Sequence, residues 1–242
     1  MSQPLPTRRD EAWRYADLDA VAKLWPLPEA EHIVVPAGGQ WARSIVQADG
    51  GVHQIKMSLG KGAVASLYVL NIGGDYGRIE LEVTLHEGAD FTLGAAQIGG
   101  DKQTLEIVTT VTHAEPDATS RQTVRSVLCG HATGTYLGKV AVARGAQHTD
   151  SEQSVKAMLL DRTATANAKP ELEIFADDVK CAHGCAIGEL DATSLFYLES
   201  RGLPPAEART LLLQAFVAGV FEGAEDAEAL QALALEKLGA LA

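Results

Sequence analysis

Residues 78 to 86 read RIELEVTLH, and apolar and polar side chains alternate at every step of this segment. The apolar residues fall on one face and the polar residues on the other, with Ile79, Leu81, Val83 and Leu85 opposite Arg78, Glu80, Glu82, Thr84 and His86. A period of two belongs to a β-strand, whose successive side chains point to opposite faces. The segment therefore predicts a half-buried β-strand.

The same pattern extends to both sides of this segment. Residues 103 to 113 alternate in the same way, through Leu105, Ile107, Thr109 and Val111. Other short apolar runs are centred near residues 56, 68, 93, 125, 141, 157 and 173, with clusters rich in Gly, Asn, Asp and Pro between them. Residues 33 to 180 are therefore expected to be almost entirely β, in roughly nine or ten strands.

Strands of this number and spacing fit a sandwich, a barrel or a stacked coil of strands, and periodicity alone does not choose among them. Small apolar residues and an aromatic content of 5% favour a narrow, closely stacked interior over a sandwich anchored by Trp or Tyr. A stacked coil would have open ends and an exposed strand edge, which need a cap or a partner.

Helical sequence flanks the β region on both sides. Residues 9 to 24 predict one short helix that ends before Trp25-Pro26. The chain therefore divides into an N-terminal helical segment (1–30), a β core (31–185) and a C-terminal helical domain (186–242).

In the C-terminal domain, Asp191 is placed to N-cap a helix that stops at Gly202, and Pro205 opens a second helix at its tolerant first turn. A helix lying on one core needs an apolar stripe about 100° wide, but the second helix is apolar over more than half of its circumference. The residues concerned are Leu211, Leu212, Leu213, Ala215, Phe216, Val217, Val220 and Phe221. Either the β core and a last helix (225–238) cover both sides, or one side receives a partner.

Composition excludes several classes of protein. The 242 residues include 20 Lys and Arg against 32 Asp and Glu, a net charge of −12 that would repel nucleic acid. No stretch approaches the length of a membrane-spanning helix. The three cysteines are an odd number, and no basic-then-apolar leader precedes Trp13, so a reducing cytoplasm is expected.

The most informative chemical motif is Cys181-Ala182-His183, where strand-like sequence stops and helical sequence begins. On an extended backbone both side chains point the same way, so one strand could offer a thiolate and an imidazole to zinc, copper or iron. Cys185 continues the spacing, but a closed structural zinc site needs a second ligand pair that the sequence lacks. The alternative is a turn with a buried thiol and a capped histidine.

Other polar residues are weaker candidates. Cys129 and His131 repeat the same spacing, and His148 and Asp150 place an imidazole near an acid. A cysteine in a β core is usually a small apolar residue, and turn histidines are usually solvated. The adjacent acids Asp177 and Asp178 are expected to form a turn.

Residues 172 to 216, LEIFADDVKCAHGCAIGELDATSLFYLESRGLPPAEARTLLLQAF, strongly resemble the C-terminal signature of the SufD branch of the SufB/SufD family of iron–sulfur cluster assembly scaffolds. HTDSEQSVKAMLL (148–160) and DEAWRYADLDAV (10–21) extend the resemblance over most of the chain. Two features depart from the family pattern. Cys185 stands where the family commonly has Ala, and the chain is short, mainly in its N-terminal helical region.

The resemblance implies a right-handed parallel β-helix and a scaffold that is not itself an enzyme. It implies a SufB-like scaffold partner and a SufC-like ATPase that docks on the helical tail, through Leu212, Phe216 and Val220. Cys181 and His183 would complete a transient iron or cluster site at the interface between scaffolds, with no cofactor stably bound. Pairing of the chain with itself remains open.

Two alternatives from other classes also remain. A parallel β-helix can be a carbohydrate-active enzyme, but such an enzyme needs a carboxylate cluster or pair, and the acids here are scattered singly. The sequence also lacks a phosphate loop and a nucleophile elbow. A stand-alone metal-binding protein would be recognised by tight metal retention in the isolated chain.

Overall fold

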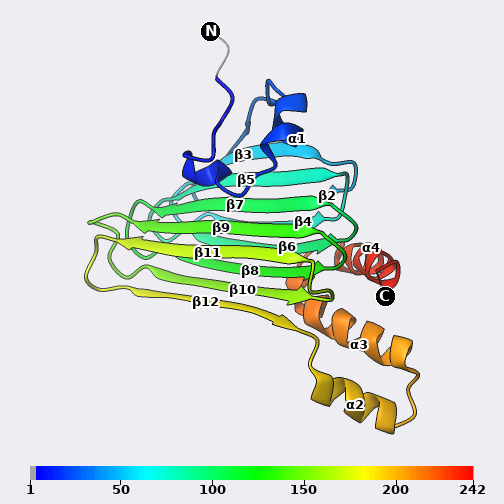
Figure 1. The fold of residues 1–242 in the computed structure, drawn as a ribbon. Helices are drawn as coiled ribbons and strands as arrows, with labels where there is room; N and C mark the ends of the chain where they lie inside the picture. The colour runs from blue at the N-terminus through cyan, green and yellow to red at the C-terminus, as the bar shows by residue number, and fades with distance from the viewer. Residues whose placement is uncertain (1–3, 242) are drawn as a thin grey trace.

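The computed structural model describes residues 4–241 (Figure 1). Within them, twelve strands form two six-stranded parallel sheets. The odd-numbered sheet contains β1 (Glu31–Val35), β3 (Gly51–Leu59), β5 (Tyr76–Leu85), β7 (Thr104–His113), β9 (Thr133–Val142) and β11 (Thr165–Ile174). The even-numbered sheet contains β2 (Gln40–Gln47), β4 (Val64–Asn71), β6 (Asp90–Gly99), β8 (Thr119–Leu128), β10 (Asp150–Leu159) and β12 (Lys180–Glu189).

Consecutive strands alternate between the two sheets, and each strand pairs in parallel with the strand two places along the chain. This is the parallel β-helix that the family resemblance implied. The expected number of strands was too low within the described residues, chiefly because β1, β2 and β12 carry no long apolar run. In β12, Cys, His, Cys and Ile alternate with Ala and Gly.

The interior between the two sheets is made by the apolar phase of the alternation. Ile79, Leu81, Val83 and Leu85 are all almost fully buried and belong to one core cluster. Stacked turns bring backbone segments close together at the ends of the strands. A Cβ added at Gly73 would lie 1.6 Å from the carbonyl oxygen of Ala48, so only glycine fits that turn.

The N-terminal segment covers the outer face of the odd-numbered sheet (Figure 1). The single helix expected over 9–24 was wrong. The segment forms a 3₁₀ turn (Glu11–Trp13) and a separate helix α1 (Leu18–Lys23). The break occurs because the carboxylate of Asp17 accepts hydrogen bonds from the backbone N–H groups of Asp19 and Ala20, which starts a new helix at that point.

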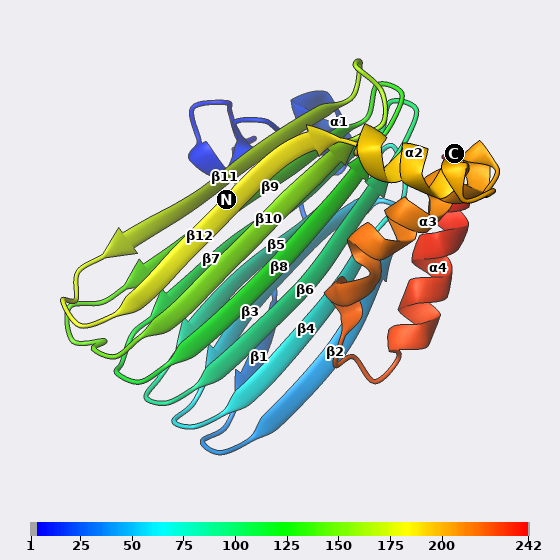
Figure 2. The ribbon, with the colours of Figure 1, turned by 90° about the horizontal axis from the view of Figure 1, so that it is seen from below.

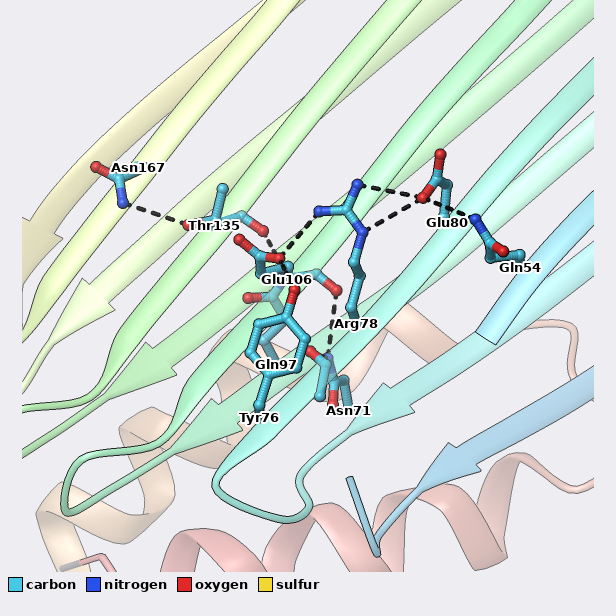
Figure 3. Close-up of polar contacts among 10 residues, drawn as sticks. Gln54, Asn71, Tyr76, Arg78, Glu80, Gln97, Glu106, Thr135 and Asn167 are labelled. Atoms are coloured by element: carbon cyan, nitrogen blue, oxygen red, sulfur yellow. Dashed lines mark hydrogen bonds and ion pairs between the residues drawn. The ribbon is translucent and has the colours of Figure 1, made fainter. Parts of the chain in front are cut away.

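This covering buries a charged cluster on the polar face of β5 (Figure 3). The guanidinium of Arg78 is fully buried, 3.8 Å from the ring of Trp13, and it donates to Glu106 at 2.9 Å and to Glu80 at 3.2 Å. The hydroxyl of Tyr76 donates to Glu106 at 2.6 Å. Alternation alone places Arg78 on a polar face but does not reveal that this face is covered.

Helices α2 (Ala192–Ser200), α3 (Pro205–Val217) and α4 (Ala227–Gly239) form the C-terminal domain, with a 3₁₀ turn (Ala218–Phe221) after α3. The Asp191 cap and the proline at the start of α3 are both confirmed. The turn and one face each of α3 and α4 pack on the outer face of the even-numbered sheet, and α2 extends beyond it (Figure 2). Among residues 4–241, no helix has the length and apolarity needed to cross a membrane.

Candidate functional site at the open end of the β-helix

The last turn of the β-helix, formed by β11 and β12, has no further turn stacked on it. Among the described residues, β12 pairs with β10 and with no other strand, so one of its edges is free (Figure 2). Every residue of β12 except Cys181 is exposed. The ten-residue strand therefore presents an open backbone edge and uncovered side chains.

Register shows which way the side chains of β12 point. Cys181 and His183 lie beside Ser151 and Gln153 of β10, both of which are buried in the interior. Paired residues in a parallel sheet face the same side, so Cys181 and His183 both face the interior, where His183 is exposed and Cys181 is half-buried. Cys185 continues this row. The sequence correctly predicted one shared direction for the thiol and the imidazole.

The motif does not lie at the junction between strand and helix, as the sequence suggested. Cys181 is the second residue of β12, and the strand continues to Glu189 before α2 begins at Ala192. Gly184, Ala186 and Gly188 leave Ile187 as the only large apolar residue of the strand after His183, and this weak apolar signal is why the strand seemed to stop too early. The two candidate ligands are therefore held on a regular strand and not on a turn.

Burial decides the protonation of the two thiols. Cys181 packs half-buried against the cluster of Val140, Val142, Ala146 and Ala176. Burial raises the pKa of its thiol above the ordinary value, although a backbone hydrogen bond at Ser151 acts in the opposite direction. Burial also raises the pKa of Cys185. Both thiols are therefore protonated at neutral pH in the empty site, and a metal ion must displace a proton to bind either sulfur.

The row of ligands is open. Residues two apart on a strand are separated by about 6.6 Å, so neighbouring side chains can lean toward one ion but the row cannot surround it. In residues 4–241, no group of three or more His, Cys, Asp or Glu side chains is arranged to hold a metal. The arrangement suits two soft ligands that a second surface completes.

The weaker candidates lie elsewhere. Cys129 follows β8 at the level of Glu189, so it is a full strand length away from Cys181. His148 is close to the motif, but its ring pairs with Asp178 at 3.1 Å in the turns that precede β10 and β12. The turn role expected for Asp178 fits this contact. His148 and Cys129 therefore do not join the row.

The helical residues proposed for docking differ in exposure. Leu212 and Phe216 are half-buried on α3, whereas Val220 is only 3% exposed and packs in the cluster between the helices and the even-numbered sheet. Val220 therefore contributes to the interior of this chain. Of the two possibilities for the broad apolar face, packing within the chain accounts for Leu213 and Val217, which are also buried.

The remaining apolar surface of the helical domain is one that the sequence did not single out. Phe196 and Tyr197 on α2 are 71% and 55% exposed, and Leu211 on α3 is 45% exposed. A shallow cavity of about 410 Å³ lies beside Leu211, lined also by Leu203, Ala206, Glu207, Thr210 and Gln214. Exposed aromatic residues on a helix are a signal for a partner surface that could have been found in the sequence.

Comparison with known families decides the relationship. The family described as SUF system FeS cluster assembly, SufBD core domain, matches residues 32–216. The chain belongs to the SufBD family. The match runs from β1 to the end of α3 and includes Cys181 and His183, whereas α1 and α4 lie outside it.

Individual relatives agree with the family match. The iron–sulfur cluster assembly protein SufD of Escherichia coli strain K12 is 34% identical over 131 residues, which are 54% of this chain and 31% of the relative. An iron–sulfur cluster assembly SufBD family protein of Synechocystis is 38% identical over 114 residues, 47% of this chain and 25% of the relative. Protein ABCI7, chloroplastic, of Arabidopsis thaliana is 41% identical over 109 residues, 44% of this chain and 23% of the relative. The matched segments thus span less than a third of each relative.

Proposed function

We propose that this chain is a scaffold subunit in iron–sulfur cluster assembly and that it holds iron or a nascent cluster transiently at the open end of its β-helix. The observation that carries the proposal is the pair formed by the half-buried Cys181 and the exposed His183, which face one way on a strand with a free edge. Membership of the SufBD family supplies the class of cargo.

A SufB-like scaffold is the proposed second half of the site, joined by strand addition to β12. The outward side of β12 begins with Lys180 and then carries four small residues, namely Ala182, Gly184, Ala186 and Gly188, so a partner backbone can approach closely along residues 182–188. By contrast, Pro170 stands in β11, the end strand of the other sheet, and a proline has no N–H for pairing. The edge of β12 is therefore the more favourable template.

The chemistry of the two ligands suits cargo that must leave. A thiolate binds iron strongly and tolerates sulfide, whereas neutral imidazole is a more labile ligand. Because the thiols are protonated in the empty site, loading releases protons and becomes more favourable as pH rises. The chain alone holds no cofactor stably, since two soft ligands leave an ion largely open to water.

A SufC-like ATPase is the proposed partner of the helical domain. Phe196 and Tyr197 on α2 and Leu211 on α3 supply its exposed apolar surface. The half-buried Leu212 is the next residue after Leu211, and Phe216 packs against the cluster between the helices and the even-numbered sheet. Val220 acts indirectly, because it anchors the end of α3 to the β-helix. The role is scaffolding and not catalysis. The three free cysteines fit a reducing compartment such as the cytoplasm.

The test is complementation in cells that depend on the complex, comparing His183→Ala with the matched control His131→Ala. Both histidines are exposed, but His131 lies in a turn at the opposite end of the strands. We expect His183→Ala to abolish cluster production while thermal stability stays within about 1 kcal/mol, the usual range for an exposed change. His131→Ala should complement fully.

Full complementation by His183→Ala would overturn the site. Size-exclusion chromatography with and without a SufB-like partner separates the remaining possibilities. A stable homodimer would assign the second half of the site to another copy of this chain, and a tightly retained equivalent of metal in the isolated chain would favour a stand-alone metal-binding protein.

A further inference from the structure

In two rows of the even-numbered sheet, the interior changes from apolar to polar toward the open end, whereas the row that contains Asn71 and Gln97 is polar at the other end. One row of inward-facing residues, one from each strand of the even-numbered sheet, reads Arg43, Leu67, Leu93, Gln122, Gln153 and His183. The two leucines and the two glutamines are all at least 99% buried. Leucine at the glutamine positions would continue the apolar packing, so the glutamines need another explanation.

A hydrogen-bonded chain fixes the orientation of these amides. The hydroxyl of Thr109 donates to Gln122 Oε1 at 2.9 Å, and the hydroxyl of Tyr136 donates to the same oxygen at 3.3 Å. Gln153 Nε2 donates to the Tyr136 hydroxyl at 3.1 Å. Because the Gln153 amide nitrogen is engaged in this way, its Oε1 atom is left buried, without a hydrogen-bond partner among the described residues.

A buried acceptor without a partner is destabilising, and it calls for an explanation. Asn71 Oδ1, Gln97 Oε1 and Gln122 Nε2 are left in the same state deeper in the interior, but only Gln153 lies beside the end strand β12. The next residue in the row is His183, one strand spacing or about 4.8 Å away between backbones. The imidazole of His183 makes no hydrogen bond within residues 4–241, so its ring nitrogens are free to pair with Gln153 Oε1. A ligating histidine usually donates its second N–H to a carbonyl or carboxylate, which fixes its tautomer and orientation.

Among the three possible ligands on β12, only Cys181 and His183 lie beside polar residues of β10. Cys181 lies beside Ser151, whose hydroxyl pairs with the hydroxyl of Ser120 at 2.9 Å. Cys185, by contrast, lies beside the apolar Val155. If the end of the β-helix were simply polar throughout, the residue beside Cys185 would be expected to be polar as well.

We propose that Gln153 is a positioning residue for His183: its Oε1 accepts the N–H of one ring nitrogen and thereby turns the other nitrogen toward the cargo ion. This inference rests on the proposed function, because it assumes that His183 binds metal. Gln153 itself does not touch the cargo. The hydrogen bond forms on loading, when the ring turns toward the interior.

The experiment is a titration of the full reduced chain with Co²⁺ under anaerobic conditions, followed by the thiolate-to-cobalt absorption. Gln153→Leu removes the acceptor, Gln153→Glu retains one, and Gln122→Leu is the matched control one turn deeper in the same row. We expect Gln153→Leu to weaken Co²⁺ binding by about 10- to 100-fold, the usual cost of losing such a partner, and the other two variants to stay within about threefold of the wild type.

Nuclear magnetic resonance of the Zn²⁺-loaded chain supplies a readout that packing alone would not change. The ring N–H of His183 should exchange slowly with water in the wild type and rapidly in Gln153→Leu. Equal loss of affinity in Gln153→Leu and Gln122→Leu, an unprotected ring N–H in the wild type, or no Co²⁺ absorption at millimolar metal would each overturn the proposal. None of these results bears on complementation by His183→Ala, which tests the proposed function separately.

Discussion

The two ends of the β-helix are built from the same rows of side chains, but they finish in opposite ways. At the first end, Trp41 packs against the core, and Arg43 forms a double hydrogen bond with Glu31 at 2.7 and 2.8 Å, linking β2 to β1. At the last end, the same two rows finish in Cys181 and His183, with no such pair above them. One end is therefore closed by this chain's own residues, and the other stays open within residues 4–241.

The strands at the two ends also differ in how well they suit pairing with another strand, and β12 is the more favourable one. β1 has five residues, and its neighbour β2 carries the charged Arg43, features that discourage edge pairing. β12 has ten residues, and four of the five on its outward side are Ala or Gly, the fifth being Lys180 at its start. The comparison teaches that exposure alone does not identify an interface, because both ends are exposed. Strand length and the closing of the interior separate them.

The largest expected effect tests which end pairs with the scaffold partner. Ile187 is 47% exposed on β12, and Val34 is 76% exposed on β1. Ile187→Glu should abolish assembly with a SufB-like partner at micromolar concentration, because the new charge would be buried without a counter-ion. Val34→Glu, at the other end, should leave assembly unchanged. Analytical ultracentrifugation of both variants decides this, and equal loss in the two would remove the distinction between the ends.

A smaller expected effect is the pH dependence of stability that the buried His113 causes in the interior. His113 bonds to Ser120 at 2.9 Å, and burial lowers its pKa from 6.5 to about 4. Between these two pH values, His113 is protonated in the unfolded chain but neutral in the folded chain. The free energy of unfolding should therefore fall as pH drops from about 6.5 to 4, by roughly 3 kcal/mol in total from this group. Urea unfolding at several pH values measures it.

His113→Leu supplies the comparison for that measurement. The variant lacks the buried imidazole, so its stability should depend less on pH across the same window. If the wild type and His113→Leu lost stability in parallel, the acid sensitivity would have to come from another group, and the interior histidine would be of no consequence for it.

The smallest effect concerns the pair that closes the first end. The hydrogen bond from Arg43 is the main cause of the lowered pKa of Glu31, so the pair contributes stability above the ordinary pKa and loses it as pH falls through the lowered value. Because the pair is partly exposed, Glu31→Gln should cost less than about 1 kcal/mol at neutral pH and a smaller amount at pH 3. Thermal unfolding at the two pH values checks this, and an equal cost at both would show that the charge is irrelevant.

Local sequence determined much of this protein. Strict alternation in residues 78–86 identified the strands because the pleat of a strand is a local property. Asp191 and Pro205 identified the starts of helices because caps and first turns depend on a few neighbouring residues. The spacing of Cys181 and His183 placed both side chains on one face for the same reason.

Only the tertiary structure decided what those faces meet. The sequence alone could not show that Arg78 is buried under Trp13, that Val220 lies in a core, or that Gln153 lies beneath His183. Each of these contacts joins residues that lie far apart in the chain, and their alignment depends on how complete turns stack. Alternation along a strand determines which face a side chain lies on. The register between stacked strands determines which residues it contacts, and those contacts determine its burial and its chemistry.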